Sequence, residues 1–244
     1  MAATKAHIIA QLQREILPLQ GFKPIANGVL VDAIPPEIKN AFPHQSFPTG
    51  AIHEFLCDNA AESAATGGFI AGIAASLMHG GAAILWISAT RTIFPLALKA
   101  FGIEPDKIIF IDLQREKDVL WAMEEALKCE GLAAVIGETS ELDFTVSRRL
   151  QLAVEQSCVT GFILRRHSRN LRTTACIARW KISSLPSELA DDMPGVGFPR
   201  WQIDLIKIRN GKPGSWQIEW RNGKFRYIPV LVNVIAPALQ KKTG

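Results

Sequence analysis

The stretch AIHEFLCDNAAESAATGGFIAGIAASLMHGGAAILWIS, residues 51–88, decides the fold class of this chain. It begins with AIHEFLC, which is apolar apart from His53 and Glu54, and ends with the apolar run AAILWIS; the two enclose a longer segment rich in small residues. An apolar run of six or seven residues is typical of a strand buried on both faces, and the longer segment is typical of a helix. The stretch therefore predicts a strand at 51–57, a helix at 63–79 and a second strand at 82–88.

The same alternation continues beyond residue 88. Helical patterns and short apolar runs follow each other at 93–101 (helix), 107–112 (strand), 116–129 (helix), 132–137 (strand), 143–156 (helix) and 160–165 (strand). Short buried strands separated by helices are typical of a parallel sheet that carries helices on both faces. We therefore expect an α/β fold with a mainly parallel central sheet flanked by helices.

The pattern changes after residue 165. Strand patterns now follow each other without helices between them, at 174–183, 200–208, 215–221 and 224–228. Asn222-Gly223 separates the last two strands, and this dipeptide favours the hairpin turn in which both central residues have a positive φ. The C-terminal part is therefore predicted to be an antiparallel hairpin extension of the α/β core.

The N-terminal residues have a different character. Apolar residues at helical spacing predict an amphipathic helix at 4–17, and a connector rich in Pro and Gly follows it. The apolar stripe of this helix consists of Ile8, Leu12 and Ile16, with two further apolar neighbours. These patterns divide the chain into an N-terminal helix with its Pro-rich connector at 1–46 and a domain at 47–244, which comprises a core at 47–187 and an antiparallel β extension at 198–232.

The composition is that of an ordinary globular protein. Of the 244 residues, 48% are hydrophobic and 20% are charged, which excludes a disordered or fibrous chain. The N-terminus has no secretory-signal pattern, and the longest apolar stretch, residues 69–78, is too short to span a bilayer, so we expect a cytoplasmic protein without membrane contact. The four cysteines form no CxxC pair and have no histidine at ligand spacing, so we expect reduced thiols and no metal site.

The formal net charge of +4 is unevenly distributed. Residues 1–155 carry twelve basic and eighteen acidic side chains, whereas residues 156–244 carry fifteen basic and five acidic ones. Arginines gather on the last predicted core helix and after the last core strand, where they suit a polyanion or an acidic protein surface; the alternative is a solvated loop. The candidate residues for such a contact are Arg148, Arg149, Arg165, Arg166, Arg169 and Arg172.

The loop after the first predicted strand is where an α/β protein places its ligand. A phosphate-binding loop at this position needs glycines, a lysine and a hydroxyl, but residues 57–69 read CDNAAESAATGGF and contain no lysine. The acidic Asp58 and Glu62 would also repel a triphosphate. We interpret Gly67-Gly68 as residues that permit close packing of the helix on the sheet, and we expect no ATP hydrolysis at this loop.

A group of carboxylates follows the strand predicted at 132–137. Glu138, Glu141 and Asp143 stand where a metal-bound carboxylate would lie in an α/β protein. They also suit capping of the next helix, with Asp143 as its N-cap. Capping is the preferred interpretation.

Three long segments resemble the ImuA family of RecA-like proteins: FPTGAIHEFL at 47–56, LWAMEEALKCEGLAAVIGE at 120–138 and LDFTVSRRLQLAVEQSCVTGFILRR at 142–166. The resemblance continues more weakly through ARWKI at 178–182 and RWQIDLIKIRNGKPG at 200–214. It implies a RecA-like, P-loop-type fold and an accessory role in SOS-induced translesion DNA synthesis and mutagenesis, beside the inactive polymerase homologue ImuB. The family is also related to SulA, an inhibitor of cell division.

Compared with RecA, the resemblance implies a degenerate nucleotide-binding loop. Cys57 falls at the first glycine of the phosphate loop, and Glu62 and Ser63 fall at its second glycine and its lysine. Thr90 falls at the acid that activates the attacking water. Gly137-Glu138 falls where the magnesium-coordinating Asp ends its strand, so that only Glu138 could substitute there. The expected protein is therefore not an enzyme and uses no nucleotide cofactor.

The preferred hypothesis is a non-catalytic accessory protein that acts by protein–protein interaction with ImuB, with RecA as a possible second partner. Ile8, Leu12 and Ile16 are the candidate docking stripe for such a partner. The alternatives are a SulA-like cell-division inhibitor, a module that binds single-stranded DNA weakly and without sequence preference, and a residual ATPase. The tryptophans of the extension, which could stack on bases, are expected in its core.

Overall fold

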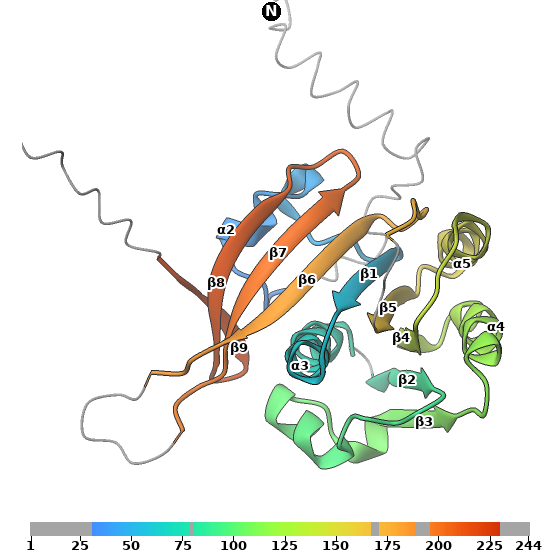
Figure 1. Cartoon of the computed structure of the whole chain (residues 1–244), viewed down its shortest axis with the longest axis horizontal. Coiled ribbons are helices and arrows are strands. Elements are labelled where there is room, and N and C mark those ends of the chain that lie inside the picture. The colour runs from blue at the N-terminus through green and yellow to red at the C-terminus, as the bar shows by residue number, and fades with distance from the viewer. Residues whose placement is uncertain (1–30, 79–80, 167–170, 189–195, 230–244) are drawn as a thin grey trace, which may run out of the picture.

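A computed structural model describes residues 31–78, 81–166, 171–188 and 196–229 (Figure 1). Within these residues the strands form one nine-stranded sheet in the order β3-β2-β4-β5-β1-β6-β7-β8-β9. The strands are β1 (Ile52–Cys57), β2 (Ala83–Ser88), β3 (Ile108–Asp112), β4 (Leu132–Thr139), β5 (Thr160–Arg166), β6 (Ala178–Leu185), β7 (Arg200–Ile208), β8 (Gly214–Arg221) and β9 (Lys224–Ile228). The helices are α2 (Pro36–Lys39), α3 (Ala60–Leu77), α4 (Glu116–Leu127) and α5 (Phe144–Ser157), with the 3₁₀ helices η1 (Pro43–Gln45), η3 (Pro95–Phe101) and η4 (Pro105–Lys107).

The sheet has a parallel part and an antiparallel part. The pairs from β3 to β6 are all parallel, and the pairs from β6 to β9 are all antiparallel. In the turn between β8 and β9, Asn222 and Gly223 have φ angles of 55° and 73°, as the Asn-Gly dipeptide predicted. The predicted α/β class with an antiparallel C-terminal extension is thus confirmed, and the arrangement is consistent with a RecA-like fold.

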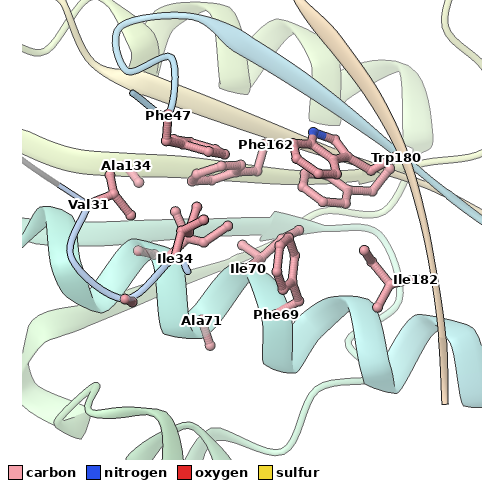
Figure 2. Packing of buried hydrophobic residues seen from close by; sticks show 14 of the residues in the cluster. Val31, Ile34, Phe47, Phe69, Ile70, Ala71, Ala134, Phe162, Trp180 and Ile182 are labelled. Carbon is pink, nitrogen blue, oxygen red and sulfur yellow. The ribbon is translucent and has the colours of Figure 1, made fainter. Parts of the chain in front are cut away.

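Helix α3 is enclosed on several sides. Its Phe69, Ile70 and Ile73 are fully buried, and Figure 2 shows Phe69 and Ile70 among residues that include Phe162 and Trp180 of the sheet. The extension packs against the same helix. Gly72 of α3 and Phe225 of β9 approach so closely that a Cβ atom added at Gly72 would lie 2.6 Å from the Phe225 ring. An apolar surface on all sides is what an enclosed helix needs, and it explains why this segment shows no polar face.

Helices α4 and α5 cover the opposite face of the parallel strands (Figure 1). Val119 and Met123 of α4 and Leu150 and Val154 of α5 form a second apolar cluster with the strands. At the start of α5 the Asp143 side chain accepts a hydrogen bond of 2.7 Å from the Val146 N–H. This contact confirms the interpretation of Asp143 as an N-cap.

The predicted helix at 93–101 is the main difference between expectation and structure. Residues Pro95–Phe101 form the 3₁₀ helix η3 instead of an α-helix, and Gly102 ends it with a φ of 88°. Pro95 lacks an N–H group and fixes the start of the segment, so that only a short helical piece fits before this glycine. The strand predicted at 174–183 is also displaced, because β6 begins only at Ala178.

Part of the predicted connector belongs to the core. Val31, Ile34 and Ile38 are at most 2% exposed and belong to the same apolar cluster as the buried residues of α3, in which Figure 2 shows Val31 and Ile34. The backbone of this segment also bonds to the extension, since the Phe225 N–H donates to the Ala33 carbonyl at 3.2 Å. Sequence alone assigned these residues to a tethering segment, but the structure packs them between the sheet and the extension.

The predicted N-terminal helix with Ile8, Leu12 and Ile16 lies outside the described residues. Among the described residues, no helix combines the length and the apolar character that crossing a membrane requires.

Candidate functional site

The residues of the predicted degenerate loop come together at one edge of the sheet. Cys57, Glu138 and Arg166 stand at or next to the C-terminal ends of β1, β4 and β5, and Thr90 follows β2. These strands are parallel, so their C-terminal ends meet at the edge where α/β proteins hold ligands. A cavity of about 510 Å³ opens there between the start of α3 and the segment that leads into η3.

The cavity has apolar walls and a few polar groups. Its walls include Trp86, Ile93, Phe94, Leu98 and Phe101. Cys57, Ser63, Gly67, Gly68 and Glu138 of the predicted site also line it, together with Arg166.

Arg166 is the central cation of this edge. Its guanidinium forms an ion pair with the Glu138 carboxylate, and its Nη2 donates to the Thr90 carbonyl at 3.2 Å and to the Thr92 hydroxyl at 3.0 Å. Burial lowers the pKa of Arg166 from its ordinary value, and nearby Cys57 and Glu116 oppose this effect. Arg166 therefore connects two positions at which the resemblance placed ATPase acids.

Glu138 has two partners within the chain itself. Its Oε1 accepts a hydrogen bond of 2.6 Å from the Trp86 indole, and its other oxygen faces Arg166. The side chain is only 3% exposed. A carboxylate that coordinates Mg²⁺ offers its charge to the ion, whereas the charge of Glu138 is already balanced by a guanidinium.

The start of α3 is capped by its own side chains. The Asn59 side chain accepts from the Glu62 N–H at 2.9 Å, and the Glu62 carboxylate accepts from the Asp58 N–H at 2.8 Å. Lys181 of β6 then binds both acids, at 2.6 Å from Asp58 and 3.5 Å from Glu62. Two backbone N–H groups at this helix start, those of Asp58 and Glu62, are thus engaged by a carboxyl and an amide oxygen, with which a phosphate would have to compete.

Sequence reasoning missed Lys181, because it searched for a cation only within the loop. Lys181 is 123 residues from Asp58, and the two meet only because β6 pairs with β1, with Lys181 opposite Leu56. The hydrogen bond that Lys181 donates to Asp58 raises the pKa of Lys181. The available signal was the alternation of β6, which places Arg179 and Lys181 on the same face.

Cys57 is a buried thiol at the base of the cavity. It lies 3.4 Å from the Thr66 hydroxyl, and burial raises its pKa to about 11. A thiol with this pKa is protonated at neutral pH and is a poor nucleophile. Its place in the site is therefore that of an apolar wall residue.

Gly67 and Gly68 approach neighbouring side chains closely. A Cβ atom at Gly68 would lie 2.8 Å from the Phe101 ring, and one at Gly67 would lie 3.3 Å from Ile93. These contacts agree with the interpretation of both glycines as packing residues. Their partners, however, belong to the η3 segment and to the extension rather than to the parallel strands alone.

The arginines that the sequence grouped together occupy different environments. Strand β5 continues to Arg166, so Arg165 does not lie in an exposed loop: it is 3% exposed and binds Glu54 at 2.7 Å. Because Arg165 is buried and paired with Glu54, it does not belong to the candidate contact surface. Arg148 and Arg149 are exposed and pair with Glu155 and Glu124, Arg172 is exposed, and Arg169 lies outside the described residues.

Glu54 organises a buried network that the sequence did not reveal. Its carboxylate accepts hydrogen bonds from Arg165, Thr174 and Arg179, at 2.7, 2.8 and 2.8 Å. A single glutamate within an apolar strand gives no sign of its partners, which lie 111 to 125 residues away. The network fixes the segment that leads into β6.

Two further expectations concern metals and aromatic side chains. Within the described ranges, no group of three or more His, Cys, Asp or Glu side chains is placed to hold a metal ion. In the extension, Trp201 and Trp220 are 4% and 6% exposed and pack against Phe101. These two tryptophans are core residues, as expected, and Trp216 is partly buried beside the same core.

Comparison with known proteins gives relatives that carry one name. No family model matches the chain. The chain is similar to Protein ImuA of Caulobacter vibrioides strain NA1000 / CB15N, with 31% identity over 198 residues. Protein ImuA of Caulobacter vibrioides strain ATCC 19089 / CIP 103742 / CB 15 matches with the same identity over the same length. Each alignment covers 75% of this chain and 80% of the relative.

Proposed function

Because this chain belongs to the ImuA family, we propose that it is a non-catalytic, RecA-like accessory protein of damage-induced translesion synthesis. In this role it acts by protein–protein interaction with an ImuB-type inactive polymerase homologue, and RecA is a possible second partner. The observation that best supports a non-catalytic role is that the charged side chains at the strand ends form ion pairs with one another. Arg166 pairs with Glu138, and the single cation Lys181 pairs with both Asp58 and Glu62.

The same contacts argue against tight nucleotide binding. A triphosphate at the start of α3 would have to displace the Asp58–Lys181 and Glu62–Lys181 pairs and would face both carboxylates. No lysine precedes or follows this loop closely enough in the sequence to offset that repulsion. An anion gains at a helix start only when the backbone donors are free to receive it.

A nucleotide titration tests this part of the proposal. We expect Mg-ATP to bind with a Kd above the millimolar range and to be hydrolysed no faster by the native chain than by Glu138→Gln. Submicromolar binding, or hydrolysis that Glu138→Gln abolishes, would contradict it. A single cooperative unfolding transition of Glu138→Gln without nucleotide, above the assay temperature, is the required control, because loss of the pair with Arg166 should lower its stability.

A binding assay with the purified ImuB-type protein from the same organism tests the partner. We expect a stable complex that forms equally well with and without ATP. Replacement of Ile8 and Leu12 by Asp should weaken the complex if the predicted N-terminal stripe is the contact. Unchanged binding by this variant would move the contact to another surface, and absence of any complex would overturn the proposed function.

A further inference from the structure

Two large apolar side chains stand exposed beside the cavity at the strand ends. Phe94, the residue before η3, is 64% exposed, and Leu96, in the first turn of η3, is 62% exposed. Exposed apolar side chains that adjoin a hollow mark binding surfaces more often than isolated ones do. The apolar surface here therefore extends from inside the cavity onto its rim.

The charges at the cavity define what it can accept. The charge of Arg166 is compensated by Glu138 and its Nη2 already binds two threonines, so it offers little net charge to an incoming anion. Glu138 is held by Arg166 and Trp86, so it offers little to an incoming cation. An uncharged apolar group enters such a site without breaking these contacts.

The exposed rim distinguishes a polypeptide from a small molecule. Phe94 lines the cavity, but Leu96 does not. A small ligand inside the cavity would leave Leu96 in water, whereas a chain that passes over η3 and inserts side chains into the cavity would cover both residues. A few buried apolar anchors surrounded by a wider contact are the usual design of a protein interface.

We propose that the groove between the start of α3 and η3 is the anchor site for the protein partner. It takes large uncharged aliphatic or aromatic side chains from one segment of the ImuB-type protein, and Phe94 and Leu96 form its rim. This inference rests on the proposed function, because it assigns the partner of that function a binding surface on this chain. The position that a nucleotide occupies in an α/β ATPase thus binds side chains of the protein partner.

A matched pair of substitutions on α3 tests the groove. Ala64 and Ala61 are both exposed on the first turns of the helix, but only Ala64 lines the cavity. We expect Ala64→Trp to fill the groove and to raise the Kd for the purified ImuB-type partner at least tenfold. Ala61→Trp should change it less than twofold. Thermal unfolding of both variants shows that each is folded.

A second pair of substitutions tests the rim without filling the cavity. Phe94→Ser with Leu96→Ser should also raise the Kd for the partner at least tenfold. Trp121→Ser is the control, because Trp121 is equally exposed, at 64%, but lies on α4 on the opposite face of the sheet.

The outcomes separate this inference from the function on which it rests. If the native chain binds the partner and Ala64→Trp binds equally tightly, the groove assignment is wrong and the proposed function stands. If the native chain binds no ImuB-type protein, both are wrong. An Ala64→Trp effect seen only on self-association, or only on binding of a single-stranded oligonucleotide, would likewise overturn the assignment.

Discussion

The carboxylate of Glu54 is fully buried in β1, where it holds two arginines and a threonine that come from β5, from β6 and from the segment before β6. Arg165 is itself 4% exposed along its side chain, so that no water replaces a lost partner. Removal of one member of a buried ion pair leaves an uncompensated charge. The stability of this region therefore depends on a single carboxylate.

We expect Glu54→Ala to lower the free energy of unfolding by roughly 3–5 kcal/mol, because two guanidiniums lose their counter-charge in the interior. Urea denaturation followed by tryptophan fluorescence measures the loss. Glu124→Ala is the control, since Glu124 pairs with the exposed Arg149, and such pairs contribute about 1 kcal/mol or less. If both variants lost the same free energy of unfolding, Glu54 would contribute no more to stability than an exposed ion pair does.

His53 gives the protein a pH dependence. The ring is fully buried, its Nε2 lies 2.7 Å from the Pro48 carbonyl, and its Nδ1 accepts from the Trp180 indole. Burial lowers the pKa of His53 to about 4, and the Pro48 contact only partly opposes this effect. Between pH 6.5 and 4 the unfolded chain therefore binds a proton that the folded chain does not.

Stability should consequently fall as the pH falls through this window, by about 2 kcal/mol between pH 7 and pH 5 from this residue. Urea midpoints measured at both pH values check the expectation. His53→Gln removes the titration and should flatten the difference between them. A native chain that is as stable at pH 5 as at pH 7 would show that His53 is not held neutral.

Among the secondary-structure elements, the β8–β9 hairpin is the one whose local sequence determines it most directly. Gly223 has a φ of 73°, and an added Cβ there would meet no atom within 4 Å. Gly223→Ala should therefore lower the free energy of unfolding by about 1–2 kcal/mol through backbone strain alone. Gly131→Ala is the matched control, because its Cβ also enters open space without a positive φ. Equal unfolding midpoints for the two variants would contradict this account.

The elements that sequence predicted well are those whose signal lies within a few neighbouring residues. The apolar runs of β1, β2 and β4, the Asn-Gly turn and the Asp143 cap are all local patterns. Helix η3 was misjudged as an α-helix because its apolar spacing suits both kinds of helix, and only the distance from Pro95 to Gly102 limits it. The sequence named several residues that line the strand-end cavity, Arg166 included, but not the ion pairs in which its cations take part. Arg166 and Lys181 come from β5 and β6, and only strand pairing places them beside Glu138 and Asp58.

At the scale of the whole molecule, the packing of the described residues continues across residue 46. Phe42 and Phe47 both contact Trp180, and the Ala41 carbonyl accepts from the Lys212 N–H at 2.8 Å. The position of these residues was not readable from the sequence, because a segment rich in Pro resembles a tether whether or not it packs. The apolar side chains of this segment were the available signal that it packs in the core.

A chain that begins at Phe47 should therefore lose its cooperative unfolding transition, because the core around Trp180 is opened and the extension loses its backbone partners. Near-ultraviolet circular dichroism and urea titration measure this. Ile34→Ala in the full chain is the milder control and should lower the free energy of unfolding by about 2–5 kcal/mol while keeping a single transition. A cooperative transition in the shortened chain would instead support the predicted domain boundary at residue 46.

The enclosure of α3 also bears on how the protein is made. The helix ends at Leu77, but the strand that covers its Gly72 side, β9, is not complete until Ile228. At the usual rate of synthesis, the ribosome needs roughly 8–30 s to add the residues in between. Throughout that interval the helix carries an apolar surface without its final cover, so the nascent chain is a client for chaperones. A product released before β9 would keep that surface exposed and would be degraded, not retained as a partly working fragment.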